Sequence, residues 1–327
     1  MAVAEACQRL LAKPVTRIEF PGGRSRKSVR AHLANGSVIV TRRRSEGRAA
    51  LEADALRQLG ARSAAVPRLL AFDGIWLIQE DLGGSRLSQA LAVANTAGAE
   101  TLLESAITAL ADLHDAGRVS EFGRHAPIIG SRTDWLERFA SMPARIGEHA
   151  TIAAPALAVD AIVDSLRIDN PTLVKWDSRP GNAMVRDGAV VWVDWEHCGR
   201  RDPLDDIAWL LADEFTPDFP EIEDRLLDRF QSLGAARRGH DAARAYLGLF
   251  GSLHMCVRFG LILSRKGDGG WWDADYCLRR DKIGVTREAA LRVCARGRRW
   301  AGWNPLVQPL ADWWARLADH LASLERN

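Results

Sequence analysis

The sequence lacks long hydrophobic runs and paired cysteines. No uninterrupted apolar run approaches the roughly 20 residues that a membrane-spanning helix needs, and the N-terminus shows no basic stretch followed by an apolar core. The five cysteines are scattered and form no C-x-x-C pair, which is unlike a disulfide framework or a zinc site. We therefore expect a cytoplasmic protein with reduced cysteines, no secretion signal and no membrane partner.

Neither sign of charge dominates the sequence. It has 44 Lys and Arg residues against 42 Asp and Glu residues, a net charge of +2, so we expect no nucleic-acid partner. The charge is nevertheless uneven, because residues 24–48 include eight basic side chains and a single acid, Glu46. Such a run is either a solvated basic edge or a cradle for a polyanionic ligand, and the run alone leaves both open.

The first 82 residues have the pattern of a small antiparallel sheet that carries one helix. Alternating or β-branched runs predict the strands, and the pairs Asn35-Gly36 and Asp73-Gly74 predict tight turns between them. A short amphipathic helix precedes the sheet, and a second helix begins near Ser45 and ends at Gly60. The expected strands cover residues 16–20, 27–33, 37–43, 68–72 and 75–80.

From about Ser85 onward the hydrophobic pattern becomes helical, with a long amphipathic helix at 100–117 and a last helix near 309–324. A β-rich segment at 172–193 interrupts the helices. A chain of 327 residues fits one large domain or two lobes at roughly 100–200 residues per domain. We predict an α+β fold with a lobe of residues 1–82, a hinge near 79–84, and a larger, mainly helical lobe of residues 83–327.

Three oxygen-bearing side chains stand at the ends of short predicted strands. Asp177 follows a strand, Asn182 comes after the Pro180-Gly181 turn, and Asp194 ends a predicted hairpin. Magnesium prefers hard oxygen ligands and usually binds through one or two carboxylates together with substrate phosphates. A carboxylate that is not a metal ligand can orient an attacking hydroxyl and accept its proton.

Three ordered sequence blocks resemble those of the aminoglycoside phosphotransferase and choline kinase family of small-molecule kinases. The blocks are K-W-D-S-R-P-G-N at 175–182, V-D-W-E at 193–196 and R-D-P-L-D-D-I-A at 201–208. The family pattern reads H-G-D-x-x-P-G-N, I-D-W-E and G-D-P-x-x-D-L-A. The resemblance implies a two-lobed, protein-kinase-like fold and an enzyme that uses ATP and Mg²⁺ to transfer the γ-phosphoryl group to a hydroxyl of a small molecule.

The resemblance also implies residue roles. Asp177 corresponds to the catalytic carboxylate, Asn182 and Asp194 to the magnesium ligands, and Asp206 to the carboxylate that braces the catalytic loop through backbone N–H groups. Glu52 resembles the acid that pairs with a cation on the third strand. The remaining cofactor-binding residues implied are Gly22, Gly23 and Ser25 in the phosphate loop and Gln79, Glu80 and Leu82 in the hinge, where backbone groups bind adenine.

Three departures from the family pattern stand out. Lys175 replaces the family histidine, the phosphate loop is rich in Arg and poor in Gly, and the third strand has no lysine. Because alternation places Val38, Val40 and Arg42 on one face, we choose Arg42 as the third-strand cation. An Arg fork is not equivalent to a Lys point charge.

These departures keep an alternative open, a pseudokinase that acts as a nucleotide-binding or scaffold protein. The acceptor also stays open. An aromatic cage around Trp271-Trp272 or Trp300 would suit choline, and the neighbouring acids Asp268 and Asp273 would suit a polycation such as an aminoglycoside. The choice between ATP and GTP and the oligomeric state are not predicted.

Overall fold

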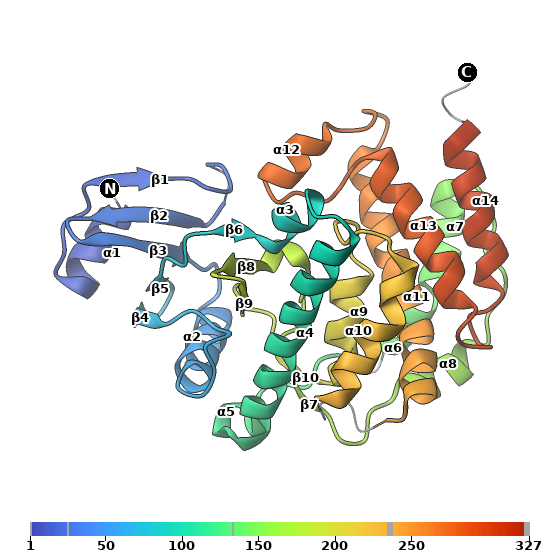
Figure 1. Ribbon diagram of the computed structural model, residues 1–327, viewed down its shortest axis with the longest axis horizontal. Coiled ribbons are helices and arrows are strands. Elements are labelled where there is room, and N and C mark those ends of the chain that lie inside the picture. Colours follow the sequence, from blue (N-terminus) through green and yellow to red (C-terminus); the bar gives the residue numbers. More distant parts are fainter. Residues whose placement is uncertain (1, 25, 133, 234–237, 324–327) are drawn as a thin grey trace.

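The N-terminal lobe is a five-stranded antiparallel sheet in the order β1-β2-β3-β5-β4 (Figure 1). The computed structural model describes residues 2–24, 26–132, 134–233 and 238–323, so Ser25 and the end of the expected last helix lie outside the described residues. The elements of this lobe are α1 (Ala2–Leu11), β1 (Arg17–Glu19), β2 (Ser28–Leu33), β3 (Gly36–Arg42), α2 (Glu46–Gly60), β4 (Leu69–Asp73) and β5 (Trp76–Glu80).

The two helices of this lobe pack against different side chains of the sheet. Cys7 of α1 lies in a small core with Val40 of β3 and Ile78 of β5. Leu56 of α2 belongs instead to the main core, together with Leu77 of β5. Because neighbouring residues of a strand point to opposite faces, α1 and α2 cover opposite faces of the sheet. Only the α2 side faces the larger lobe (Figure 1).

The chain crosses between the lobes through a tightly held linker. The Asp81 carboxylate accepts hydrogen bonds from Ser37 Oγ (2.6 Å), Arg30 Nη2 (3.0 Å) and the Gly83 N–H (3.2 Å). The following strand β6 (Ser85–Arg86) pairs with β8 of the larger lobe. The hinge is therefore tied to β2 and β3 on one side and to the catalytic region on the other.

The larger lobe is mainly helical and contains two small sheets, β6-β8-β9 and β10-β7. The long helices α4 and α11 run through it with α9, α10 and α13 beside them (Figure 1). Its helices are α3 (Leu87–Ala92), α4 (Thr96–Val119), α5 (Glu121–His125), α6 (Trp135–Ala140), α7 (Met142–Ala150), α8 (Val159–Leu166), α9 (Pro203–Leu211), α10 (Pro220–Ser232), α11 (His240–Lys266), α12 (Ala274–Arg279), α13 (Arg287–Ala301) and α14 (Leu310–Ser323). The remaining elements are β7 (Thr172–Val174), the 3₁₀ turn η1 (Pro180–Asn182), β8 (Ala183–Arg186), β9 (Ala189–Trp192) and β10 (Gly199–Arg201).

Large aromatic side chains fill the core of this lobe. Trp192, Trp195, Trp300, Trp313 and Trp314 are fully buried, so Trp300 serves packing rather than an open aromatic cage. Among the described helices, α11 alone has the length and apolarity to cross a membrane, but 72% of its apolar window is buried inside the protein, which is typical of a core helix. The predicted α+β fold, a small antiparallel sheet lobe joined to a larger helical lobe, is confirmed.

Two adjacent glycines in the linker give a matched test of close packing. Gly83 and Gly84 both have positive φ (62° and 65°), but an added Cβ at Gly84 would lie 2.2 Å from the Val185 carbonyl oxygen, whereas at Gly83 it would meet nothing within 4 Å. We expect Gly83→Ala to lower the free energy of unfolding in urea by about 1 kcal/mol through backbone strain. Gly84→Ala should lower it by about 1–3 kcal/mol more, because the β6–β8 pairing must shift. An equal loss of unfolding free energy in the two variants would contradict the close packing of Gly84 against β8.

Candidate active site

The catalytic loop lies between β7 and η1 and has a strained backbone. Trp176 and Asp177 are consecutive non-glycine residues with positive φ, 50° and 53°. Asp206, fully buried on α9, accepts hydrogen bonds from the backbone N–H groups of Lys175 (2.7 Å) and Trp176 (2.8 Å) and from Ser178 Oγ (3.0 Å). The Asp206 carboxylate thus holds the loop in a conformation that its sequence alone disfavours.

His114 completes the support of this loop. His114 lies inside α4, before the last turn of that helix. Its Nε2 is 2.8 Å from Asp206 Oδ2, and both side chains are buried. Lys175, which replaces the family histidine, is 1% exposed, and its Nζ donates to the Asp194 carbonyl oxygen (2.6 Å). The Lys175 ammonium also lies over the Trp195 ring, 5.3 Å from its centroid. Lys175 therefore ties the catalytic loop to the 193–196 block.

Asp177, Asn182 and Asp194 come together at the junction of the lobes, where Arg43 contacts Asp194; this junction is the cleft of the site. Asn182 Nδ2 donates to the Asp177 backbone oxygen (2.9 Å) and to Asp177 Oδ2 (2.8 Å). This orientation turns the Asn182 side-chain oxygen away from Asp177. Asp194 follows β9 with φ of 62° and keeps 39% of its side chain exposed. Within the described residues, neither Asn182 Oδ1 nor Asp194 Oδ2 has a hydrogen-bond partner.

The two aspartates have opposite electrostatic surroundings. Burial raises the pKa of Asp177, and the positive charges of Arg179 and Lys175 offset only part of that rise. Burial alone would also raise the pKa of Asp194, but the charges of Arg43 and Lys175 outweigh it and hold the pKa of Asp194 below its usual range. The charged form of Asp194 is therefore favoured, while Asp177 is the better proton acceptor of the two.

The third-strand cation is Arg43, and the prediction of Arg42 is wrong. Arg43 Nε and Nη2 donate to the two oxygens of Glu52 at 2.6 and 2.8 Å. Arg42 is exposed and lies over the Trp76 ring, 5.8 Å from its centroid. Val38, Val40 and Arg42 do share one face, as alternation requires, but Val38 and Val40 pack into the core beneath α1. The following residue, Arg43, points to the opposite face, where α2 and the cleft lie.

The Arg43 guanidinium reaches beyond Glu52. Its Nη2 donates to Asp194 Oδ1 (2.7 Å) and its Nη1 to Glu196 Oε1 (2.8 Å). Glu196 lies in the recognised D-W-E block but was assigned no role from the sequence. One fork of donors thus joins α2, the end of β3 and the 193–196 block.

The expected phosphate loop touches the larger lobe. Gly22 and Gly23 form a turn in which the Gly23 N–H donates to the Phe20 carbonyl oxygen (2.9 Å). Arg26 Nη2 lies 3.0 Å from Asp281 Oδ2, and the same carboxylate receives Arg179 Nη2 at 2.7 Å. Asp281 belongs to no recognised motif and could not have been found from the sequence. It connects the phosphate loop to the catalytic loop.

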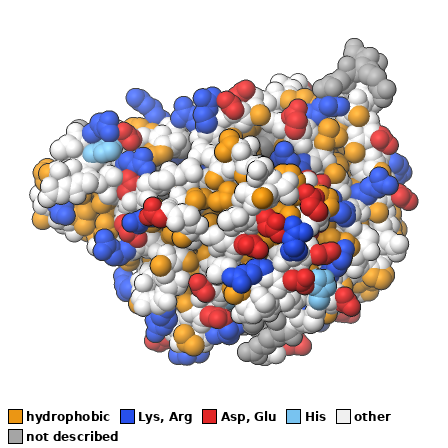
Figure 2. All heavy atoms as spheres, in the orientation of Figure 1, with side chains coloured by type: hydrophobic (Ala, Val, Ile, Leu, Met, Phe, Trp, Pro, Cys, Tyr) orange, Lys and Arg blue, Asp and Glu red, His pale blue; other side chains and the backbone are white. Residues whose placement is uncertain are grey.

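Part of the basic run at 24–48 pairs with acidic side chains of the protein, while Arg24, Lys27, Arg42, Arg44 and Arg48 are exposed. Arg26, Arg30 and Arg43 pair with Asp281, Asp81 and a set of site carboxylates, respectively. Arg26, Arg30 and Arg43 therefore belong neither to a wholly solvated basic edge nor to an open site for a polyanionic ligand. On the face seen in Figure 2, Lys and Arg side chains are interspersed with Asp and Glu.

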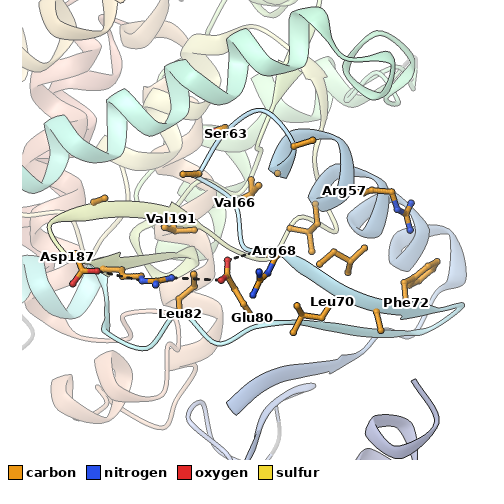
Figure 3. A pocket seen from close by; sticks show the side chains of 18 residues that line it. Arg57, Ser63, Val66, Arg68, Leu70, Phe72, Glu80, Leu82, Asp187 and Val191 are labelled. Atoms are coloured by element: carbon orange, nitrogen blue, oxygen red, sulfur yellow. Dashed lines mark hydrogen bonds and ion pairs between the residues drawn. The ribbon is translucent and has the colours of Figure 1, made fainter. Parts of the chain in front are cut away.

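Two of the three hinge residues predicted to bind adenine, Glu80 and Leu82, have side chains that line a hollow away from the catalytic loop. Gln79 is buried at the end of β5. Glu80 and Leu82 face a hollow of about 810 Å³ formed by the end of α2, β4 and the β8–β9 hairpin (Figure 3). There the Glu80 carboxylate accepts a hydrogen bond from the Arg68 N–H (2.8 Å). No residue of the catalytic loop or the 193–196 block lines this hollow, so contacts of Glu80 or Leu82 to adenine would come from the backbone.

Aromatic side chains lie directly beside Asp177. The Trp176 ring lies 5.4 Å from that of Trp209 and 6.1 Å from that of Trp135, centroid to centroid. His254 packs against Trp209 at 4.1 Å, and burial lowers the pKa of His254 to about 3, so this imidazole is neutral. These rings form one aromatic cluster that includes Trp176 of the catalytic loop, and Trp300 stacks instead on Trp303.

Comparison with known proteins agrees with this geometry. The model of the APH phosphotransferase enzyme family matches residues 16–246. An amicoumacin kinase in complex with AMP-PNP and Ca²⁺ has a similar structure, with a TM-score of 0.62 at 16% identity over 87% of this chain and 94% of that one. A macrolide 2′-phosphotransferase from Brachybacterium faecium gives 0.57 at 19% identity over 89% and 97%.

A choline kinase from Streptococcus pneumoniae gives a TM-score of 0.54 at 13% identity, over 90% of this chain and 98% of that one. Comparison with the curated proteins gives no match. The similar structures establish the kinase-like fold, and the family model covers well over half of the chain. The resemblance is confirmed: the chain belongs to the APH phosphotransferase enzyme family.

Proposed function

We propose that the protein transfers the γ-phosphoryl group of ATP to a hydroxyl of a small molecule, with the help of Mg²⁺. The observation that carries this proposal is the meeting of Asp177, Asn182 and Asp194 at one cleft, beside the Arg43–Glu52 ion pair. Phosphoryl transfer depends mostly on positioning and charge neutralisation, and these residues supply both.

The donor set fits a magnesium ion that is shared with a nucleotide. Asn182 Oδ1 and Asp194 Oδ2 have no hydrogen-bond partner within the described chain, and Asp177 Oδ1 has none either. In the same part of the chain, no group of three or more His, Cys, Asp or Glu side chains could hold a metal alone. Mg²⁺ is commonly held by one or two protein ligands with phosphate oxygens and waters completing the shell. When bound, the ion would neutralise charge on the phosphates.

Asp177 is the group placed to receive the acceptor proton. Its hydrogen bond from Asn182 fixes one carboxylate oxygen, and its raised pKa makes it a better base than an ordinary aspartate. Arg43 and the neighbouring Lys175 bring positive charge to the same side of the cleft. Both side chains are buried, so their charge would act on the transferred group from a distance and not through direct contact.

A small acceptor is supported by how the chain continues after Asp194. Only residues 195–198 separate it from β10, and α9 begins at Pro203, so no long activation segment intervenes. The similar structures include an amicoumacin kinase, a macrolide phosphotransferase, a choline kinase and a phosphotransferase in complex with gentamicin. These four kinds of compound are the first panel of acceptors to screen. The five free, buried cysteines support our further proposal of a cytoplasmic location.

We expect Asp177→Asn to reduce kcat on any acceptor found in that panel by about a hundredfold to ten-thousandfold, since the base is lost. Nucleotide binding should be unchanged because Asp177 is not placed as a metal ligand. Radiolabelled phosphate transfer and a nucleotide thermal shift measure the two effects. Asp187→Asn, whose carboxylate is 94% exposed, is the control and should match the wild type. Near-wild-type turnover of Asp177→Asn would refute the assigned role.

The pH dependence of kcat/KM should report the raised pKa of Asp177. The group must be ionised to accept a proton, so the rate falls as the pH is lowered through its pKa. Since burial raises that pKa, the acid limb should lie above the range of an ordinary aspartate and should be absent from the residual activity of Asp177→Asn. A limb at the ordinary position in both proteins would argue against Asp177 as the base.

Thermal unfolding tests the metal site without an acceptor. A nucleotide held at 100 times its dissociation constant stabilises the native state by about 2.7 kcal/mol. We expect this stabilisation with ATP in the wild type only when Mg²⁺ is present, and its loss in Asp194→Asn. A magnesium-dependent shift without transfer to any acceptor would favour the pseudokinase alternative, whereas no shift with any nucleotide would overturn the proposed function.

A further inference from the structure

Asp194 has two competing demands on its carboxylate. As a magnesium ligand it must offer oxygens to the metal, yet its Oδ1 already accepts a hydrogen bond from Arg43 Nη2 at 2.7 Å. A divalent cation at Asp194 would repel the nearby guanidinium and draw the carboxylate toward itself. Arg43 therefore needs another carboxylate partner that holds it in place when Asp194 binds the metal. This inference rests on the proposed function.

Glu196 is the group in place to do this. Its Oε1 lies 2.8 Å from Arg43 Nη1, on the side of the guanidinium not used by Glu52. Nε and one N–H of Nη2 bind Glu52, and the other N–H of Nη2 binds Asp194, so only Nη1 is left for a further partner. The Arg43 side chain is 8% exposed, so an unpaired Nη1 has little water to turn to.

We propose that Glu196 is a positioning residue that holds Arg43 on the Glu52 side of the cleft and so frees Asp194 for the metal. Without Glu196, the guanidinium would have Asp194 as its sole carboxylate partner besides Glu52, and Mg²⁺ would have to compete with it. The same geometry explains an arginine in place of lysine. A planar fork with separate donors can serve three carboxylates at once, whereas an ammonium on a flexible stem is a single point of charge.

The test is a magnesium titration of the ATP-induced thermal shift, which needs no acceptor and no turnover. We expect the magnesium concentration for half-maximal shift to rise about tenfold or more in Glu196→Gln, as for other residues that orient metal ligands. Glu100→Gln on α4 is the control. The Glu100 side chain is 22% exposed against 23% for Glu196, and it also pairs with an arginine, Arg225 of α10, which contacts none of the site residues in the described chain. This control should titrate like the wild type.

A second background separates positioning from a simple loss of negative charge near the metal. In Arg43→Lys, the ammonium can still pair with the buried Glu52 but cannot bridge to Glu196 and Asp194 together. If Glu196 acts through Arg43, the added Glu196→Gln change should shift the titration less than twofold in this background. If it acts through its charge alone, the tenfold rise should persist, and the inference is overturned.

The two proposals fail differently. A wild type with a magnesium-dependent shift and an unchanged Glu196→Gln titration would overturn this inference alone. A wild type with no such shift would overturn the proposed function and this inference with it. Where acceptor turnover is available, Glu196→Gln should raise the KM for Mg²⁺ while kcat at saturating Mg²⁺ changes less than threefold, a split that a merely structural loss would not produce.

Discussion

The active cleft depends on one guanidinium that joins three carboxylates. Arg43 bridges Glu52 of α2, Asp194 after β9 and Glu196, and so connects the small lobe to the large one at the point where phosphate would lie. Three negative charges against one positive charge would repel one another in a dry site. Partial solvent access at Asp194 and the neighbouring Lys175 ammonium reduce this repulsion. The excess of negative charge is what the divalent cation proposed for this site would neutralise.

A second set of ion pairs joins the phosphate loop to the larger lobe. Asp281 collects Arg26 from the phosphate loop and Arg179 from the catalytic loop, and Arg258 engages Glu214 through two hydrogen bonds at 2.8 and 2.6 Å. These acids are therefore satisfied from within the protein. A buried charge that loses its partner destabilises the fold. Each ion network therefore holds together the helices and loops that supply its side chains.

The parts of the site that could be predicted from the sequence are those whose residues lie close together in the chain. Asp177, Asn182 and Asp194 lie within one stretch, and the β-rich segment around them was visible from its pattern. Arg42 was chosen over Arg43 because alternation reveals which residues share a face but not which helix covers that face. Asp281 was missed because its partners lie about a hundred or more residues away and no motif surrounds it. Such contacts are decided by tertiary packing, which a single sequence does not record.

Gly181 of the P-G-N turn has no positive φ, so its backbone would accept other residues. Its missing side chain is required by space: a Cβ there would lie 2.2 Å from Asp281 Oδ1. That carboxylate also holds the arginine of the phosphate loop. A glycine in the catalytic block thus leaves the space in which the Asp281 carboxylate binds the small lobe, so a larger residue at 181 would displace the contact between the lobes.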